Sequence, residues 1–336
     1  MSEQQKRFEP SLLELTTGLL AGDRAYLSRA ITLAESSRAE DQASFTELLA
    51  GIPPQANTVR VGISGIPGVG KSTFIEAFGL FLTGQNKRVA VLAVDPSSER
   101  SRGSILGDKT RMEQLAKHPL AYIRPTPAGT TRGGVADSTH KAIHLCEAAG
   151  YDTILVETVG VGQSETAVRH LVDFFLVLML PGAGDELQGI KKGILELADA
   201  LVIHKCDGDN VKKATIAKAE LQQAMHLLEP NESGWTVPIL TCSSVENKGI
   251  DVIWRTIEKY VAATRQNGFF LANRKNQQIY FFEQLVQEKL RSLLNTDQLR
   301  QTRETLTQQV AAGSLPPEQA AQKLWQALVN SLLLHK

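Results

Sequence analysis

Gly65-Ile66-Pro67-Gly68-Val69-Gly70-Lys71-Ser72 is the stretch of this chain that decides its fold. It follows an apolar, β-rich run (Val59–Ser64) and precedes a helical pattern (Ser72–Leu82). It matches GxxxxGK[ST] in full, and its glycines let successive backbone N–H groups point inward at phosphate oxygens. The loop also ends where a helix begins, and the unpaired amides at that end attract anions. The sequence therefore predicts a phosphate-binding loop whose nucleotide contacts run from Gly65 through Thr73.

The last two residues of the motif have separate expected roles. The ammonium group of Lys71 would bridge the β- and γ-phosphates of a nucleotide. The hydroxyl of Ser72 would bind Mg²⁺, which prefers oxygen ligands. A glycine-rich turn that binds nothing is the alternative. The complete motif in its strand–loop–helix setting favours nucleotide binding over that alternative, with Lys71 as a catalytic residue.

Between residues 58 and 265 the chain alternates short apolar runs with helical patterns. Near-continuous apolar runs are typical of parallel strands that helices cover on both faces. We therefore predict an α/β fold of the P-loop NTPase class, with a doubly wound, mainly parallel sheet at 58–265. A helical N-terminal extension (1–57) and a helical C-terminal arm (266–336) complete the expected domains. The predicted strands are Val59–Ser64, Val89–Asp95, Ala121–Arg124, Thr153–Glu157, Phe174–Leu180, Ala200–Lys205 and Pro238–Cys242.

The composition argues against several other classes of protein. Among 336 residues, Lys and Arg number 36 and Asp and Glu also number 36, so the chain lacks the basic field of a nonspecific nucleic-acid binder. The three cysteines, Cys146, Cys206 and Cys242, form no disulfide or metal-binding pattern. The longest apolar stretch, Leu171–Leu180, is about half the roughly 20 residues of a spanning helix, and no signal-peptide core is evident. We expect a soluble, cytoplasmic protein with no nucleic-acid or membrane partner.

The strand predicted at 200–205 ends in the sequence HKCD (204–207), which resembles the guanine-reading NKxD box. The carboxylate of Asp207 can accept hydrogen bonds from two guanine donors that adenine lacks, and the stem of Lys205 can lie over the base. His204 replaces the usual Asn, which braces the phosphate loop and the base pocket. An imidazole still donates a hydrogen bond, so we expect guanine specificity to survive. GTP or GDP is the predicted nucleotide.

Two further loops are expected at the carboxyl ends of the strands, where ligands bind in open α/β sheets. The turn Ser243-Ser244 takes the place of a loop whose backbone N–H contacts guanine O6. Glu157 takes the slot of the DxxG box, so its carboxylate would reach Mg²⁺ directly or through water. Gly160 would offer its N–H to the γ-phosphate, and loss of that phosphate would release the loop.

Other loop residues are candidates for assisting hydrolysis. Asp95 ends the strand after the phosphate-loop helix, and Asp108 lies in a loop that could close over the phosphates, so we expect both at the metal. Solvated loop carboxylates are the alternative. Gln163 is offset from the usual position of a water-orienting glutamine, and Arg100, Arg102 and Arg132 are candidate charge stabilisers. With none of these clearly in position, we predict slow intrinsic hydrolysis that a partner accelerates.

Six motifs together resemble the MeaB/ArgK family along nearly the whole chain. They are GIPGVGKS (65–72), VDPSS (94–98), ILGDKTRM (105–112), ETVGVGQSE (157–165), PGAGDELQGIKKGI (181–194) and HKCD (204–207). The resemblance implies a GTPase that attends methylmalonyl-CoA mutase, an adenosylcobalamin enzyme, and governs its cofactor loading or protects it from inactivation. It also implies a homodimer through the C-terminal helices. It puts Mg²⁺ and nucleotide roles on Lys71, Ser72, Asp95, Asp108 and Glu157, and base recognition on Lys205 and Asp207.

The loop Pro181–Leu187 suggests a relay. It begins at a strand end, contains small flexible residues, and presents Asp185 and Glu186 before Lys191 and Lys192. We hypothesise that it is a mobile loop that carries the nucleotide state to the mutase. A plain strand-to-helix turn is the alternative.

Two other functions stay open. One is a kinase or ATPase that serves arginine/ornithine-type amino-acid transport. The HKCD sequence and the lack of a spanning segment argue against it, and nucleotide preference would decide. The other is a nickel-insertion GTPase. Such proteins commonly carry a His-rich or Cys/His metal store, whereas the seven histidines here are scattered.

Overall fold

The computed structural model describes residues 10–53, 57–95, 112–127, 134–158, 164–182, 192–225, 232–294 and 296–333, without the side chains at 94–95, 126–127, 134–136, 164–165, 192, 297–298 and 332–333. Contacts divide the chain into two compact units, one up to Gln277 and one from Gln278 onward. The first unit holds the sheet and the predicted nucleotide site.

A seven-stranded, all-parallel sheet forms the centre of the first unit, in the order β3-β2-β4-β1-β5-β6-β7. The predicted α/β fold and all seven predicted strands are confirmed. β4 and β5 are buried along their whole length, as expected for strands covered on both faces. The strands are β1 (Val59–Gly65), β2 (Val89–Asp95), β3 (Ala121–Pro127), β4 (Thr153–Glu157), β5 (Phe174–Met179), β6 (Ala200–Ile203) and β7 (Ile239–Thr241).

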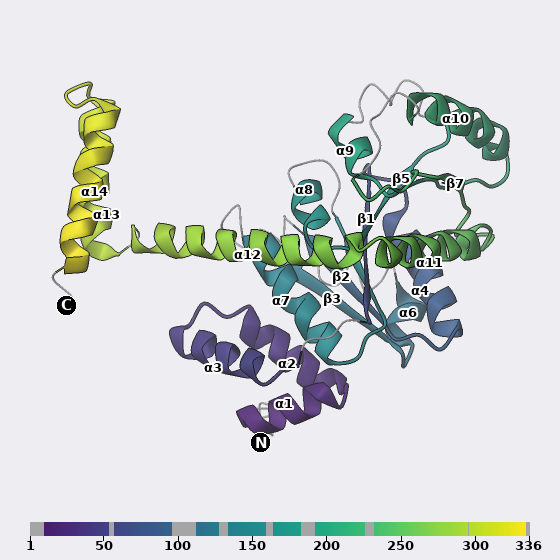
Figure 1. Cartoon of the computed structure of the whole chain (residues 1–336), viewed down its shortest axis with the longest axis horizontal. Coiled ribbons are helices and arrows are strands. Elements are labelled where there is room, and N and C mark those ends of the chain that lie inside the picture. Colours follow the sequence, from purple (N-terminus) through teal and green to yellow (C-terminus); the bar gives the residue numbers. More distant parts are fainter. Residues whose placement is uncertain are drawn as a thin grey trace, which may run out of the picture. The chain divides into compact units, whose positions relative to one another are not determined.

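Helices lie on both sides of this sheet, with α7 on one side and α4 and α6 on the other (Figure 1). Two short helices, α6 and α8, were not predicted, because five or six residues are too few to show a helical period. The helices described from the first strand to the start of the C-terminal arm are α4 (Lys71–Gly84), α6 (Glu113–Lys117), α7 (Gly134–Ala148), α8 (Ser164–Arg169), α9 (Lys192–Leu197), α10 (Asn210–Met225), α11 (Ile250–Gln266) and the first helix of the arm itself, α12 (Phe269–Leu293).

A buried hydrophobic cluster packs α4 and α11 against the central strand β1. Val61 and Ile63 of β1 point to the same side and join a buried cluster that includes Phe74 and Phe78 of α4 and Trp254 of α11. This cluster fixes α4, and with it the helix end that follows the phosphate loop.

The predicted N-terminal helical region is confirmed as α1 (Leu12–Leu20), α2 (Arg24–Ala34) and α3 (Ala39–Ala50), of which α1 and α2 contact α7. Asp23 caps α2, because its carboxylate accepts hydrogen bonds from the N–H groups of Ala25 and Tyr26. Leu27 and Ile31 of α2 are fully buried. These helices therefore extend the core of the first unit.

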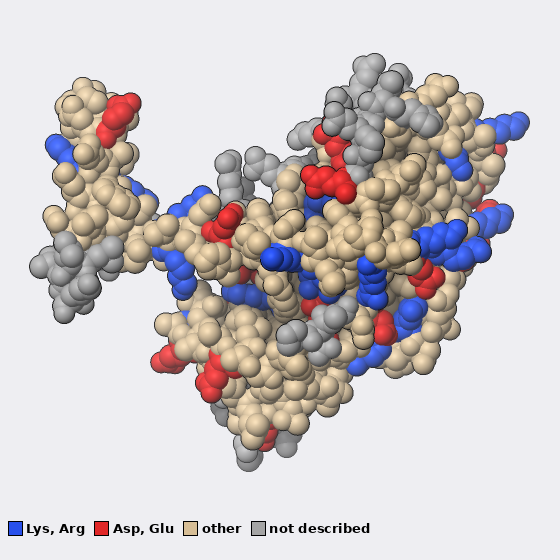
Figure 2. Space-filling view, viewed as in Figure 1, with Lys and Arg blue, Asp and Glu red and all other residues tan. Residues whose placement is uncertain are grey.

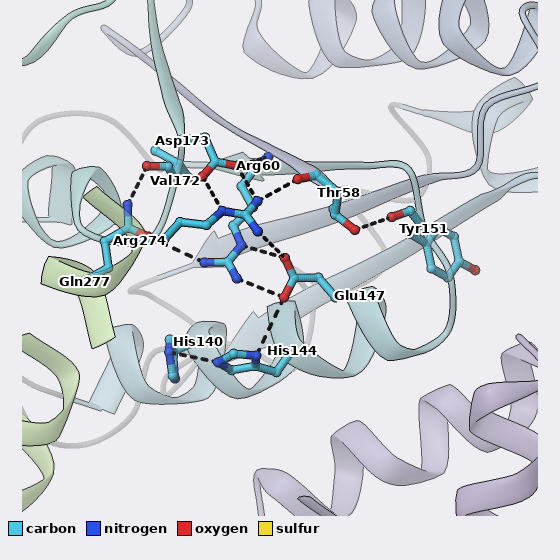
Figure 3. A network of polar contacts seen from close by, with 10 residues as sticks. All are labelled: Thr58, Arg60, His140, His144, Glu147, Tyr151, Val172, Asp173, Arg274 and Gln277. Atoms are coloured by element: carbon cyan, nitrogen blue, oxygen red, sulfur yellow. Dashed lines mark hydrogen bonds and ion pairs between the residues drawn. The ribbon is translucent and has the colours of Figure 1, made fainter. Parts of the chain in front are cut away.

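A buried ionic network lies at the amino ends of the strands, opposite the phosphate loop (Figure 3). The guanidinium of Arg60, in β1, donates two hydrogen bonds of 2.8 Å to the carboxylate of Glu147, in α7. The guanidinium of Arg274, in α12, donates to both oxygens of Asp173 at 2.8 and 2.7 Å. Two cations thus meet two anions, and the network is neutral overall.

Further hydrogen bonds fasten the start of α12 to this network. Arg274 also donates to the carbonyl of Thr58 and lies 3.8 Å from Glu147. The amide of Gln277 donates to the carbonyl of Val172 at 2.7 Å and accepts from Arg60 at 3.5 Å (Figure 3). Buried polar groups are costly unless they are paired, so these contacts hold the start of α12, up to Gln277, in a defined place within the first unit.

The second unit contains the rest of α12, then α13 (Asp297–Ala311) and α14 (Pro317–Leu333), which contact each other. Leu299 and Leu328 are buried. Pro317 is the first residue of α14, a position where its missing N–H and fixed φ favour helix initiation. α13 was not predicted, because its sequence has few apolar residues to show a period.

Candidate nucleotide site

The phosphate loop joins β1 to α4 through two glycines in left-handed conformations. Gly68 has φ +78°, and Gly70, which precedes the first residue of α4, has φ +96°. A side chain would be strained at either position. No side chain caps the start of α4, so its first N–H groups face the loop as a ready anion site.

Lys71 lies folded over this loop. Its ammonium group donates hydrogen bonds to the carbonyl oxygens of Gly65 at 2.8 Å and Ile66 at 3.3 Å, and the residue is only 9% exposed. Phosphate oxygens are stronger partners for an ammonium group than backbone carbonyls are, because they carry charge. The position is therefore suited to an exchange of these carbonyls for a phosphate.

Ser72 and Glu157 come together from α4 and β4. Glu157 pairs in register with Ile63 of β1, which places its carboxylate beside the phosphate loop, where the hydroxyl of Ser72 donates to it at 3.2 Å. Two oxygens on adjacent positions around Mg²⁺ lie about 3 Å apart, given metal–oxygen distances of about 2.1 Å. The pair therefore fits this ion in both chemistry and spacing. The neighbouring Thr158, fully buried, donates to the hydroxyl of Ser64 at 3.0 Å and ties β4 to β1.

The HKCD residues follow β6 at the same edge of the sheet. Lys205 adopts φ +57°, and its ammonium group donates to the carbonyl of Gly68 at 2.8 Å. The carboxylate of Asp207 is half-buried and accepts a 2.6 Å hydrogen bond from the hydroxyl of Ser243. The predicted base-reading loops are thus next to each other, and Lys205 links one of them to the phosphate loop.

His204 is almost fully buried between these parts, with 2% exposure. One ring nitrogen, Nδ1, lies 2.7 Å from the carbonyl oxygen of Val69, and the other, Nε2, lies 2.7 Å from the hydroxyl of Ser244. Burial lowers the pKa of His204, so its ring is neutral near pH 7. The substitution of His for Asn retains a bridge between the two loops.

The arrangement of phosphate loop, acidic strand end and HKCD residues is that of a guanine-nucleotide hydrolase. The sequence profile of the family described as methylmalonyl Co-A mutase-associated GTPase MeaB matches residues 27–299. This chain belongs to the MeaB family. It is a GTPase, an enzyme that hydrolyses GTP.

Relatives of this MeaB-family chain match it over most of their length. A probable GTPase from Mycobacterium tuberculosis is 50% identical over 92% of this chain and 93% of its own. The GTPase ArgK of Escherichia coli is 46% identical, covering 89% and 91%. The mitochondrial methylmalonic aciduria type A homolog of Mus musculus is 42% identical, covering 97% and 81%.

A solved structure shares the fold of this MeaB-family chain. The crystal structure of a LAO/AO transport system kinase superposes on it with a TM-score of 0.74. The two sequences are 38% identical, and the match covers 94% of this chain and 97% of the kinase chain. The P-loop NTPase fold and its helical extensions are therefore those of a known architecture.

Several predicted site residues lie outside the described part of the MeaB-family chain. For Asp95 the strand end is described but the side chain is not. In the part of the chain with described side chains, no three His, Cys, Asp or Glu residues are grouped as a metal site. Residues wholly outside the described ranges are Arg100, Arg102, Asp108, Arg132, Gly160, Gln163, Asp185, Glu186 and Lys191.

Sequence reasoning missed two contacts of this site. The hydrogen bond from Thr158 to Ser64 was not foreseen, although Thr158 directly follows the predicted metal ligand Glu157. The contact of Lys205 with the carbonyl of Gly68 was also missed, because residues so far apart in sequence are brought together only by the order of the strands.

Proposed function

We propose that this GTPase is a chaperone of adenosylcobalamin-dependent methylmalonyl-CoA mutase and couples hydrolysis of Mg-GTP to cofactor loading or to protection of the mutase. The description of the matching family, which names association with the mutase, carries this proposal. The mouse relative, named for methylmalonic aciduria type A, aligns with 97% of the chain and supports it.

For the triphosphate, we propose that the backbone N–H groups from Gly65 to Thr73 surround the β- and γ-phosphates. Lys71 would exchange its contacts with the carbonyls of Gly65 and Ile66 for phosphate oxygens and so stabilise the charge that develops during hydrolysis. Gly160 is proposed to donate its N–H to the γ-phosphate. Catalysis in this scheme comes from positioning and charge stabilisation, without a covalent intermediate.

For the metal, Ser72 and Glu157 are the proposed ligands from the described part of the chain, since their oxygens lie 3.2 Å apart beside the phosphate loop. Asp95 and Asp108 are proposed as further metal or catalytic groups. When bound, Mg²⁺ would neutralise phosphate charge. Glu157 is 8% exposed and accepts a hydrogen bond from Ser72, so its own role is to hold a carboxylate oxygen at a fixed, nearly dry position.

For the base, we propose that Asp207 accepts hydrogen bonds from guanine and that Ser243 holds its carboxylate in place. Ser243 is itself fixed, because its backbone exchanges two hydrogen bonds of 3.0 Å with Lys248. The N–H of Ser244 is proposed to contact guanine O6. Lys205 would lie against the base while its ammonium group remains on the phosphate loop.

We further propose that the chain is a homodimer and that the C-terminal region (266–336) supplies the contact. Five large apolar side chains of α12 are between 40% and 66% exposed, and charged side chains are sparse on the visible face of α13 and α14 (Figure 2). Such an apolar surface is typical of a subunit interface. The five side chains are Ile279, Phe282, Leu285, Val286 and Leu290.

Sedimentation of the purified protein tests the dimer. We expect wild type to sediment as a dimer and Phe282→Glu as a monomer, because a charge would be buried at the interface. Ile216→Glu is the matched control, since Ile216 is also exposed but lies on α10. A monomeric wild type, or a dimeric Phe282→Glu, would contradict the proposal.

The partner is tested with purified methylmalonyl-CoA mutase. We expect the mutase to be retained on immobilised protein in a manner that depends on whether GDP or a non-hydrolysable GTP analogue is bound. We also expect GTP hydrolysis to be slow alone and faster with the mutase. A rate that the mutase does not change, with no retention in either nucleotide state, would refute the chaperone role.

The variant Asp185→Ala tests whether the loop 181–187 carries the nucleotide state to the mutase. We expect it to lose the stimulation of hydrolysis by the mutase and to keep the rate of the protein alone.

A second candidate is a kinase that serves amino-acid transport, because the solved relative is named as a LAO/AO transport system kinase. In the described part of the chain, none of the helices has the length and apolar character needed to cross a bilayer. Competition between ATP and GTP for the site distinguishes the two functions. Preference for GTP supports the chaperone, and strong preference for ATP supports the kinase.

A further inference from the structure

We propose that His204 is a positioning residue that locks the phosphate loop to the base-recognition loop, and that it does so as a single tautomer with its proton on Nδ1. The inference rests on the proposed nucleotide site and adds a specific role for a residue outside the base- and phosphate-binding set.

The two hydrogen bonds of the ring fix the tautomer. The carbonyl oxygen of Val69 can only accept, so Nδ1, 2.7 Å away, must carry the hydrogen. A neutral ring then has a lone pair on Nε2, and the hydroxyl of Ser244, also 2.7 Å away, must donate to it. Hydrogen-bond donation therefore runs in one direction: Ser244 donates to the ring, and the ring donates to the phosphate loop.

Two packing contacts, with Gly70 of the phosphate loop and with Phe74 of α4, also hold the ring in this position. The phosphate loop meets the ring at Gly70, where an added Cβ would lie 2.8 Å from Cε1 and 2.9 Å from Nδ1 of His204. Phe74 of α4 packs edge-on against the ring, with centroids 6.1 Å apart. The imidazole is thus seated directly against the loop backbone, and a shift of either loop would break a buried hydrogen bond.

This polarity determines which substitutions preserve the lock. An Asn can donate from its amide nitrogen to Val69 and accept from Ser244 at its amide oxygen, so it reproduces both bonds. An Asp has no donor and would place a negative charge beside the carbonyl of Val69. An Ala leaves that carbonyl and the hydroxyl of Ser244 buried without this partner.

Calorimetric titration with GDP and with a non-hydrolysable GTP analogue tests the lock. We expect His204→Ala to weaken both affinities by about ten- to a hundredfold, the effect of leaving buried polar groups unpaired. His204→Asn should recover most of this loss, and His204→Asp should not. His170→Ala is the matched control at a histidine outside the site. Circular dichroism of each variant establishes that it is folded.

A double variant separates a lock from general packing. If the ring acts through Ser244, the losses of His204→Ala and Ser244→Ala should not add in the combined variant, because each breaks the same bond. Fully additive losses would overturn the inference, as would a folded His204→Ala that binds both nucleotides like wild type.

Nitrogen-15 spectra of the histidine rings in nucleotide-free protein provide the second readout. We expect His204 to show a protonated Nδ1 and an unprotonated Nε2 at pH 7, which a merely space-filling ring would not require. A protonated Nε2 would overturn the inference whatever the binding data. If wild type binds neither guanine nucleotide, the proposed nucleotide site is wrong, and the role of His204 is wrong with it. If wild type binds both nucleotides and His204→Ala binds them equally well, only the role of His204 is wrong.

Discussion

The two edges of one sheet use polar side chains in opposite ways, although β1 contributes to both. Arg60 at its start and Gly65 at its end lie roughly 16 Å apart along the strand. At the edge formed by the amino ends of the strands (the amino edge), Arg60 and Arg274 are paired with the carboxylates of Glu147 and Asp173. At the carboxyl edge, the ammonium groups of Lys71 and Lys205 donate to backbone carbonyls, and we propose that phosphate oxygens replace those of Lys71.

The difference separates stability from function. Charges that are buried and paired with charges must stay paired, because breaking one pair leaves an uncompensated charge in the core. Charged groups that rest on neutral carbonyls lose little when a ligand displaces those carbonyls. Variants of the ion pairs at the amino edge should therefore change unfolding and spare hydrolysis, whereas variants of Lys71 at the carboxyl edge should do the reverse.

The largest expected effect is at the carboxyl edge. Lys71→Ala should lower GTP hydrolysis by about 10²- to 10³-fold, the scale for removing one group that stabilises the transition state, and should weaken nucleotide binding. The unfolding midpoint should stay near that of wild type. Lys248→Ala is the control, since Lys248 is exposed and pairs with Glu246. A turnover rate unaffected by Lys71→Ala would remove this lysine from the mechanism.

The next effect is at the amino edge. Glu147→Ala leaves Arg60 and Arg274 buried without their shared carboxylate, and we expect it to lower the free energy of unfolding by about 3–5 kcal/mol. Urea titration measures this loss. Glu246→Ala, which breaks an exposed pair, should cost about 0–1 kcal/mol. If Glu147→Ala proved as mild as its control, or altered the GTP affinity of the folded protein, the separation of the two edges would fail.

A smaller loss is expected at the start of α12. Gln277→Leu leaves the carbonyl of Val172 without its donor, and we expect a cost of about 1–3 kcal/mol. Gln278→Leu, at an exposed neighbouring position, should stay within about 0.5 kcal/mol of wild type. Urea titration again gives both values, and equal losses in the two variants would remove Gln277 from the network.

The smallest effect is a pH dependence at the amino edge. Burial, then the neighbouring His144 and the charge of Arg60, lower the pKa of His140 to about 2, and burial also lowers the pKa of His144. Above about pH 6.5, the ordinary pKa, both rings are neutral in the folded and the unfolded chain. As the pH falls below it, the unfolded chain takes up protons that the buried ring of His140 cannot, so the free energy of unfolding decreases. His140→Asn should therefore show a shallower loss of stability between pH 7 and pH 5. Parallel curves for the variant and wild type would contradict this.

Much of the fold followed from local sequence patterns. The seven strands and the phosphate loop were predicted because apolar runs and a complete motif act over a few residues. The helices α6, α8, α11 and α13 were missed. The first two are too short to show a period, and α13 is polar along most of its length and contacts α14. α11 buries one apolar face, which includes Ile253, Trp254 and Ile257, so its helical period could have been read from the sequence.

The candidate site was predicted in its residues but not in its contacts. Lys71, Ser72, Glu157 and Asp207 were named from motifs, and the structure brings all four to one edge of the sheet. The network at the opposite edge was not anticipated at all. A signal existed, because Asp173 interrupts a long apolar run and a buried charge requires a partner.

The sequence by itself pointed to the chemistry of this GTPase, since a complete phosphate-loop motif, an acidic strand end and a sequence that resembles the guanine-reading box each lie in consecutive residues. Only the tertiary structure decided which of these groups touch, as with His204 between Val69 and Ser244, or Arg60 between Glu147 and Gln277. The physical reason is that a motif depends on neighbours along the chain, whereas a buried hydrogen bond depends on strand order and helix packing. Those are set by the burial of the whole apolar core.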